Sequence, residues 1–205
     1  MQTNYINMKI NHFLIVSLSM FLLACSTEST EVSAVSDVLV TNVNEIVDMH
    51  SMSNVSQVKT KHLHLELAVD FEGKTLIGTA KHTIENVTGT SKIIFDTKQL
   101  DIKKVELDNG ELANYRVIKG NDMLGDALEV EILAETKNVT IFYKTQPSSE
   151  AIQWLNPQQT AGKEQPFLFT QGEAVLTRSW IPLQDTPSNR RVGPLRKAKL
   201  LNESM

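Results

Sequence analysis

A glutamine and a glutamate flank a glycine at Gln171-Gly172-Glu173, and these residues offer the clearest chemistry in the chain. Two polar side chains presented on one face beside a glycine can make a recognition site. Residues 166–170 have the apolar pattern of a strand, which would place Gln171 and Glu173 on one face. The pattern indicates a recognition site whose use depends on its surroundings.

Two histidines are candidate metal ligands, because His62 and His64 would point the same way from a strand. A catalytic zinc normally has three protein ligands, and no third candidate stands out in the sequence. We therefore expect the pair to lie on a solvent-facing surface, and we assign no metal ligand. The sequence also lacks a His-Glu-x-x-His motif, a Gly-rich phosphate loop and a Gly-x-Ser-x-Gly elbow. No catalytic residue is assigned in this chain.

Two tryptophans and an aspartate near this stretch have structural alternatives. Trp154 and Trp180 could form a platform for a ligand, although a large aromatic residue in a β-sandwich is more often part of the core. Asp185 precedes Thr186-Pro187, which is typical of a turn. None of the three is assigned a functional role.

The composition is that of an ordinary globular protein. The chain has 205 residues, 41% of them hydrophobic and 21% charged, with a net charge of −4. This balance argues against a nucleic-acid-binding protein, which usually has a strongly basic face. The single cysteine excludes an internal disulfide and a cysteine-rich metal site.

That cysteine ends a predicted secretion signal, residues 1–25, in which Met8 is the expected functional start. The apolar run from 13 to 23 is about half of the ~20 residues that a membrane-spanning helix needs. Leu22-Leu23-Ala24-Cys25 resembles the lipobox of bacterial lipoproteins, which implies lipidation of Cys25 and attachment to a membrane surface. The alternative is an ordinary signal peptide that happens to contain a cysteine.

Ser26 follows the cysteine in place of aspartate, which would fit the outer membrane of a Gram-negative cell, facing the periplasm. Residues 26–57 contain no proline or glycine and show no sustained period. They are predicted to be a flexible tether. Within it, residues 38–47 could form a short helix or strand.

From residue 58 onward the hydrophobic period is two, as in half-buried strands. Leu63, Leu65, Leu67 and Val69 share one face, and a turn at residues 71–74 predicts a hairpin with residues 76–84. Further strands are expected at residues 92–96, 102–107, 115–118, 128–132 and 139–143. Many short strands separated by turn signals predict an all-β fold, either an antiparallel β-sandwich or an open, saddle-shaped sheet.

Five segments follow one another along the chain: Asp96-Thr97-Lys98-Gln99-Leu100, Ile102-Lys103-Lys104-Val105, Ala151-Ile152-Gln153-Trp154-Leu155, residues 159–171, and Gln184-Asp185-Thr186-Pro187-Ser188. In this order they resemble the N-terminal β-domain of the M1 family of zinc aminopeptidases. The similarity is greatest to the leukotriene A4 hydrolase and cold-active aminopeptidase branch. The resemblance covers residues 58–189.

The resemblance implies roles for the residues of the opening stretch. Glu173 would help bind the free α-ammonium of a peptide substrate, Gln171 would line the first side-chain pocket, and Gly172 would lie between them. Peptide N-termini are expected partners only where a catalytic domain is present. Zinc belongs to the intact family, and we expect none to be bound by this chain.

Residues 190–205 depart from the family pattern. Five basic residues stand there against the acidic Glu203, and the family's next strand is not recognisable. We therefore expect a domain that is incomplete at its C-terminal end, the substrate-anchoring part of an exported aminopeptidase, truncated before its zinc site and inactive alone. The alternatives are a lipid-anchored, non-catalytic β-module that binds peptides or proteins, and a poorly folded remnant with an open sheet edge.

Overall fold

The computed structural model describes residues 48–108, 110–189 and 197–200, all of which belong to one compact unit. The predicted signal, Cys25 and residues 26–47 of the predicted tether lie outside these residues. Within the described ranges, no helix is long and apolar enough to cross a membrane.

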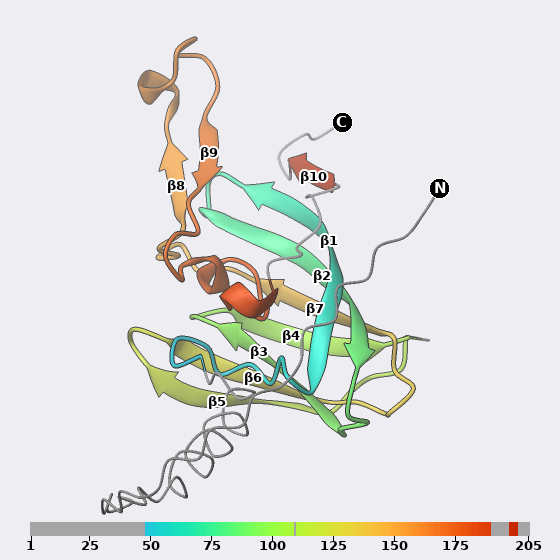
Figure 1. The fold of residues 1–205 in the computed structure, drawn as a ribbon. Helices are drawn as coiled ribbons and strands as arrows, with labels where there is room; N and C mark the ends of the chain where they lie inside the picture. Colours follow the sequence, from blue (N-terminus) through green and yellow to red (C-terminus); the bar gives the residue numbers. More distant parts are fainter. Residues whose placement is uncertain (1–47, 109, 190–196, 201–205) are drawn as a thin grey trace, which may run out of the picture. The chain divides into compact units, whose positions relative to one another are not determined.

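Ten β-strands and three short 3-10 turns make up the described structure (Figure 1). The strands are β1 (Val58–Asp70), β2 (Thr75–Asn86), β3 (Lys92–Thr97), β4 (Asp101–Leu107), β5 (Tyr115–Asn121), β6 (Gly125–Glu131), β7 (Asn138–Lys144), β8 (Ile152–Leu155), β9 (Phe167–Thr170) and β10 (Lys197–Leu200). The 3-10 turns are η1 (Pro157–Gln159), η2 (Thr177–Ser179) and η3 (Pro187–Asn189). The strands form a five-stranded sheet in the order β10-β1-β2-β7-β4, a three-stranded sheet β3-β6-β5 and a two-stranded sheet β8-β9.

The first hairpin follows from the period of two in the sequence. In β1, Leu63, Leu65 and Leu67 are buried, whereas the residues between them are partly or fully exposed. The chain turns at residues 71–74 and β2 returns antiparallel, with Leu65 opposite Ala80. The predicted hairpin and all-β fold are confirmed.

The core lies where the inner faces of the five-stranded and three-stranded sheets contribute to one cluster. The five-stranded sheet supplies Leu65, Ile141 and Tyr143, and the three-stranded sheet supplies Phe95 and Leu128, all buried. Burying such apolar side chains contributes about 1.5–3 kcal/mol each. The cluster fixes both sheets, so the loops that leave them have fixed starting points.

His82 on β2 is the titratable group most deeply placed in this core. Its Nε2 lies 3.0 Å from the carbonyl oxygen of Pro182, and its Nδ1 lies 3.3 Å from the hydroxyl of Thr60. The Phe95 ring packs on the imidazole, with centroids 4.5 Å apart. A carbonyl can only accept, so Nε2 donates and the neutral tautomer satisfies both contacts. Burial lowers the pKa of His82 to about 3.

One strand was not expected. Residues 197–200, within the basic segment that we did not recognise as a strand, form β10 and pair parallel with β1. The register runs from Glu66 opposite Lys197 to Val69 opposite Leu200. The sheet is therefore mixed, and this part of the β1 edge is paired, unlike the open edge of the alternative in which the domain is a poorly folded remnant.

Candidate functional site

Gln171, Gly172 and Glu173 follow the end of β9. That strand pairs antiparallel with β8, from Leu155 opposite Phe167 to Ile152 opposite Thr170. One more backbone bond, from Gln171 N to the Ala151 oxygen at 2.8 Å, extends the pairing. The strand ends at Thr170, and Glu173 begins a turn. The expectation that Gln171 and Glu173 share one face of a strand is therefore wrong, because the chain bends between them.

The bend presents two exposed polar side chains. The amide oxygen of Gln171 accepts a hydrogen bond of 3.2 Å from the backbone nitrogen of Glu173. The Glu173 carboxylate makes no hydrogen bond or ion pair with any residue that the structure describes. The peptide bond between Glu173 and Ala174 is cis. The segment thus combines a fixed glutamine with a carboxylate that is free to bind another molecule.

Gly172 is required by a neighbour in the same chain. A Cβ added there would lie 2.2 Å from the Thr177 hydroxyl. The Gly172 oxygen accepts hydrogen bonds from Leu176 N at 3.0 Å and from the Thr177 hydroxyl at 3.4 Å. The glycine therefore lets the turn fold back on itself, which is a reason for it independent of any substrate.

Arg178, in η2, stabilises the turn that follows Gly172. Its side chain has no exposed surface. Its Nε donates to Asp185 Oδ2 at 3.1 Å, Nη1 donates to the Leu124 oxygen at 2.8 Å, and Nη2 donates to the His50 oxygen at 2.7 Å. One guanidinium therefore joins three segments that are distant in sequence.

Asp96 and Asp185 balance this charge. The Asp96 carboxylate lies 3.8 Å from the guanidinium and accepts from Met52 N at 2.7 Å and from Asp185 N at 2.9 Å. Burial raises the pKa of the Asp185 carboxyl, and its hydrogen bond with Arg178 acts in the opposite direction. Asp185 is thus more than the simple turn residue that we expected. Sequence reasoning missed Arg178 and Asp96, whose only signal was a charge within a largely apolar segment.

The segment that follows η2 is attached to β1 through Gln184. Its buried amide donates to the Val58 oxygen at 2.8 Å and accepts from Thr60 N at 2.9 Å. Gln184 also lines a groove of about 640 Å³. Other residues of that groove come from the segment after Glu173 and from β1, namely Ala174, Val175, Thr177, Trp180 and Leu65. Ala174, the residue after Glu173, therefore lines a groove with apolar and polar walls.

The remaining candidates are the two tryptophans and the histidine pair. Trp154 and Trp180 are partly buried and pack against the core, and the Trp154 ring meets Phe71 edge-on at 5.6 Å. His62 and His64 lie on the outer face of the five-stranded sheet, as we expected. In the described part of the chain, no three His, Cys, Asp or Glu side chains are grouped to hold a metal ion. The zinc of the family has no site among these residues.

Comparison with known proteins identifies the fold as that of a peptidase domain. Residues 59–191 match the peptidase M1 N-terminal domain, and the chain belongs to that family. Leukotriene A-4 hydrolase of Xenopus laevis is 36% identical over 154 residues, which are 70% of this chain and 24% of that protein. Leucine aminopeptidase 2 of Coccidioides immitis is 30% identical over 156 residues, which are 73% and 25% of the two chains.

Solved structures show the same fold. Yeast LTA4 hydrolase in complex with bestatin superposes with a TM-score of 0.64 at 28% identity, over 75% of this chain and 24% of that one. An M1 zinc metallopeptidase from Deinococcus radiodurans shares the fold, with a TM-score of 0.50 at 19% identity over 70% of this chain and 32% of that one. The chain spans about a quarter of the length of these curated relatives. The family predicted from the sequence is confirmed.

Proposed function

We propose that this chain is the substrate-anchoring N-terminal domain of an exported zinc aminopeptidase, in which Glu173 binds the free α-ammonium of the peptide. The observation that carries this proposal is the Glu173 carboxylate, exposed and without a partner among the described residues. The name of one relative, leucine aminopeptidase 2, supports a role in peptide hydrolysis.

The position of Glu173 suits the binding of a peptide's amino terminus. An ammonium group that approaches Glu173 would meet a carboxylate with no competing cation within 4 Å among the described residues. The buried Arg178 network holds the turn in place, so little conformational entropy is lost on binding. Gln171 stands beside it and, in this proposal, lines the pocket for the first side chain. The neighbouring groove leaves room for another surface to close over the peptide.

The chemistry of bond cleavage would come from a catalytic domain. In the intact family the zinc provides an activated water, and the sequence of this chain contains no His-Glu-x-x-His motif that could hold the metal. Our proposal therefore assigns binding, and no chemical step, to the residues present here.

We expect the purified chain to show no hydrolysis of leucine p-nitroanilide above the buffer rate, with or without added zinc. The reason is that an exposed carboxylate alone supplies neither a metal-activated water nor a positioned base. The release of p-nitroaniline, followed by its absorbance, gives the measurement. Zinc-dependent turnover that co-purifies with the chain, and that a chelator abolishes, would contradict the proposed division of labour.

Export and lipid attachment through Cys25 complete the proposal. They rest on the predicted signal in the sequence, and the membrane surface is the proposed location of the domain. Labelled palmitate should enter the wild-type chain and should be absent from Cys25→Ser when each is expressed in a Gram-negative host. Equal labelling of both would refute the anchor.

A further inference from the structure

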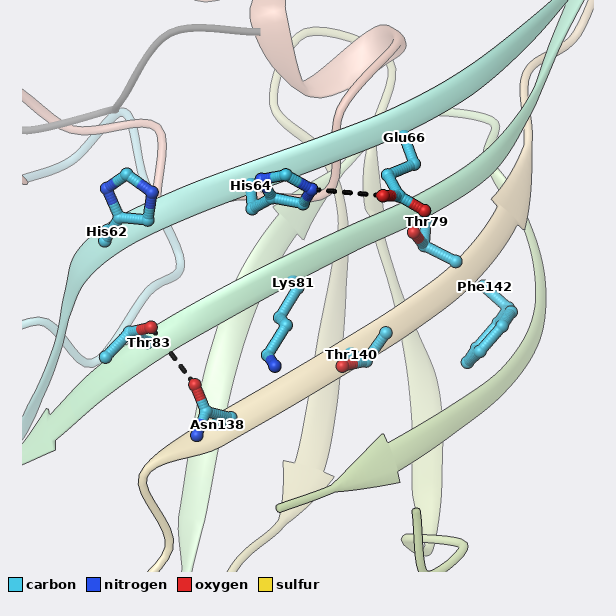
Figure 2. A pocket seen from close by; sticks show the side chains of 9 residues that line it. All are labelled: His62, His64, Glu66, Thr79, Lys81, Thr83, Asn138, Thr140 and Phe142. Carbon is cyan, nitrogen blue, oxygen red and sulfur yellow. Dashed lines mark hydrogen bonds and ion pairs between the residues drawn. The ribbon is translucent and has the colours of Figure 1, made fainter. Parts of the chain in front are cut away.

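The outer face of the five-stranded sheet carries a hollow of about 770 Å³ that is distant in sequence from Glu173 (Figure 2). Its floor is a grid formed by alternate residues of three neighbouring strands. Across the sheet the rows are His62, Thr83 and Asn138; His64, Lys81 and Thr140; and Glu66, Thr79 and Phe142. From strand and residue spacings the grid measures roughly 10 Å by 13 Å, room for about two or three sugar rings.

Some of these side chains satisfy one another. His64 Nε2 lies 3.3 Å from Glu66 Oε1, and the Thr83 hydroxyl donates to Asn138 Oδ1 at 3.1 Å. Both contacts are drawn in Figure 2. Asn138 is also bonded to Asp108 at 2.9 Å. These contacts pair residues at the margins of the grid, whereas polar groups in its middle have no hydrogen-bond partner among the described residues.

Lys81 occupies the middle of the grid. It is exposed, its neighbours across the strands are His64 and Thr140, and no carboxylate lies within 4 Å of its ammonium among the described residues. The hydroxyls of Thr79 and Thr140 likewise have no partner there. An ammonium group on the same grid as two unpaired hydroxyl groups suits a ligand that has both an anionic group and hydrogen-bonding groups.

The third row adds an aromatic edge. Phe142 lines the hollow, and one face of its ring is covered by the Lys104 ammonium, 4.2 Å from the centroid. Lys104 is in turn paired with Glu106 at 2.6 Å. An aromatic ring beside polar groups suits a ligand that has an apolar C–H face as well as polar edges.

We propose that this face binds an acidic saccharide, with its carboxylate on Lys81, its hydroxyls on Thr79 and Thr140, and a ring face against Phe142. An acidic saccharide combines all three kinds of group in two or three linked rings. A nucleic acid fits poorly, because it usually needs a strongly basic face, and Lys81 is the one lysine or arginine among the described residues that line this hollow. A peptide strand would be expected to pair along a sheet edge, whereas this site is on a sheet face.

Isothermal titration of the purified chain with α-1,4-linked trigalacturonate tests the proposal, together with backbone NMR shifts that locate the site. We expect binding, shifts confined to the grid, weaker binding of neutral maltotriose, and a loss of at least about tenfold in affinity for Lys81→Met. The affinity of Lys81→Gln, which keeps a hydrogen-bond donor, should lie between the affinities of wild type and Lys81→Met. Lys119→Met is the matched control, since this exposed lysine lies on β5 and pairs with Asp126 at 2.8 Å.

Four outcomes would overturn the proposal. These are no binding of trigalacturonate, equal affinity of wild type and Lys81→Met, NMR shifts on another face, and equal binding of inorganic phosphate or hexaglutamate. The last would show a general anion site or a site for acidic peptides. Circular dichroism of each variant confirms that an altered affinity reflects the exposed side chain and not loss of the fold.

Discussion

Replacing Arg178 with methionine should lower the free energy of unfolding by about 3–5 kcal/mol, the range for breaking a buried ion pair by removing one partner. The reason lies in what the guanidinium leaves behind. Asp185 and Asp96 would lose their cation, and the carbonyl oxygens of Leu124 and His50 would lose their donors. Methionine fills much of the same volume, so the loss is mainly one of charge and hydrogen bonds.

Urea unfolding followed by circular dichroism measures this effect, and Arg116→Met is the control. Arg116 is on exposed β5 and pairs with Glu129 at 2.8 Å, with a side chain that is 67% exposed. Its loss should cost about 0–1 kcal/mol, as for other surface ion pairs. Because a domain of this size has about 5–15 kcal/mol of stability, Arg178→Met could also leave a large unfolded fraction in water. A loss of 1 kcal/mol or less, about that of the control, would show that the Arg178 network does not hold the turn.

Acid should destabilise the domain through His82. Its folded pKa is about 3, whereas an unfolded histidine has its ordinary value near 6.5. The unfolded state therefore binds the extra proton between these values, and stability falls as the pH falls. From pH 7 to pH 5 the free energy of unfolding should decrease by about 2 kcal/mol through this residue alone.

The matched variant is His82→Gln, whose amide can still donate to Pro182. It should be less stable at pH 7 because the packing against Phe95 changes, but its stability should vary little between pH 7 and pH 5. If wild type and His82→Gln show the same slope, the histidine is not held neutral in the core.

The sequence predicted the strands well wherever one face is buried. In β1, Leu63, Leu65 and Leu67 alternate with polar residues, and this local pattern is enough to assign both strand and inner face. β10 was missed because its pairing with β1 depends on a distant partner, and its basic, Gly-Pro-containing surroundings do not predict a strand.

The site was predicted in part. The choice of Gln171, Gly172 and Glu173 came from residue types and a family resemblance, and their roles stay predictions. Their placement after the strand could not be foreseen, because it depends on Gly172 closing on Thr177. The Arg178 network joins positions 50, 96, 124 and 185, and a single sequence carries no signal for contacts between residues so far apart.

The central claim, that Glu173 anchors the peptide amino group, can be tested in a chimera. Residues 58–189 would replace the corresponding segment of yeast LTA4 hydrolase, whose structure superposes on this chain with a TM-score of 0.64. The measurement is kcat/KM for leucine p-nitroanilide, with Glu72→Gln in the exposed turn after β1 as the control. We predict that Glu173→Gln lowers kcat/KM by at least about 30-fold, because a charged partner of the ammonium is lost. Equal kcat/KM for the parent chimera and Glu173→Gln would contradict the account.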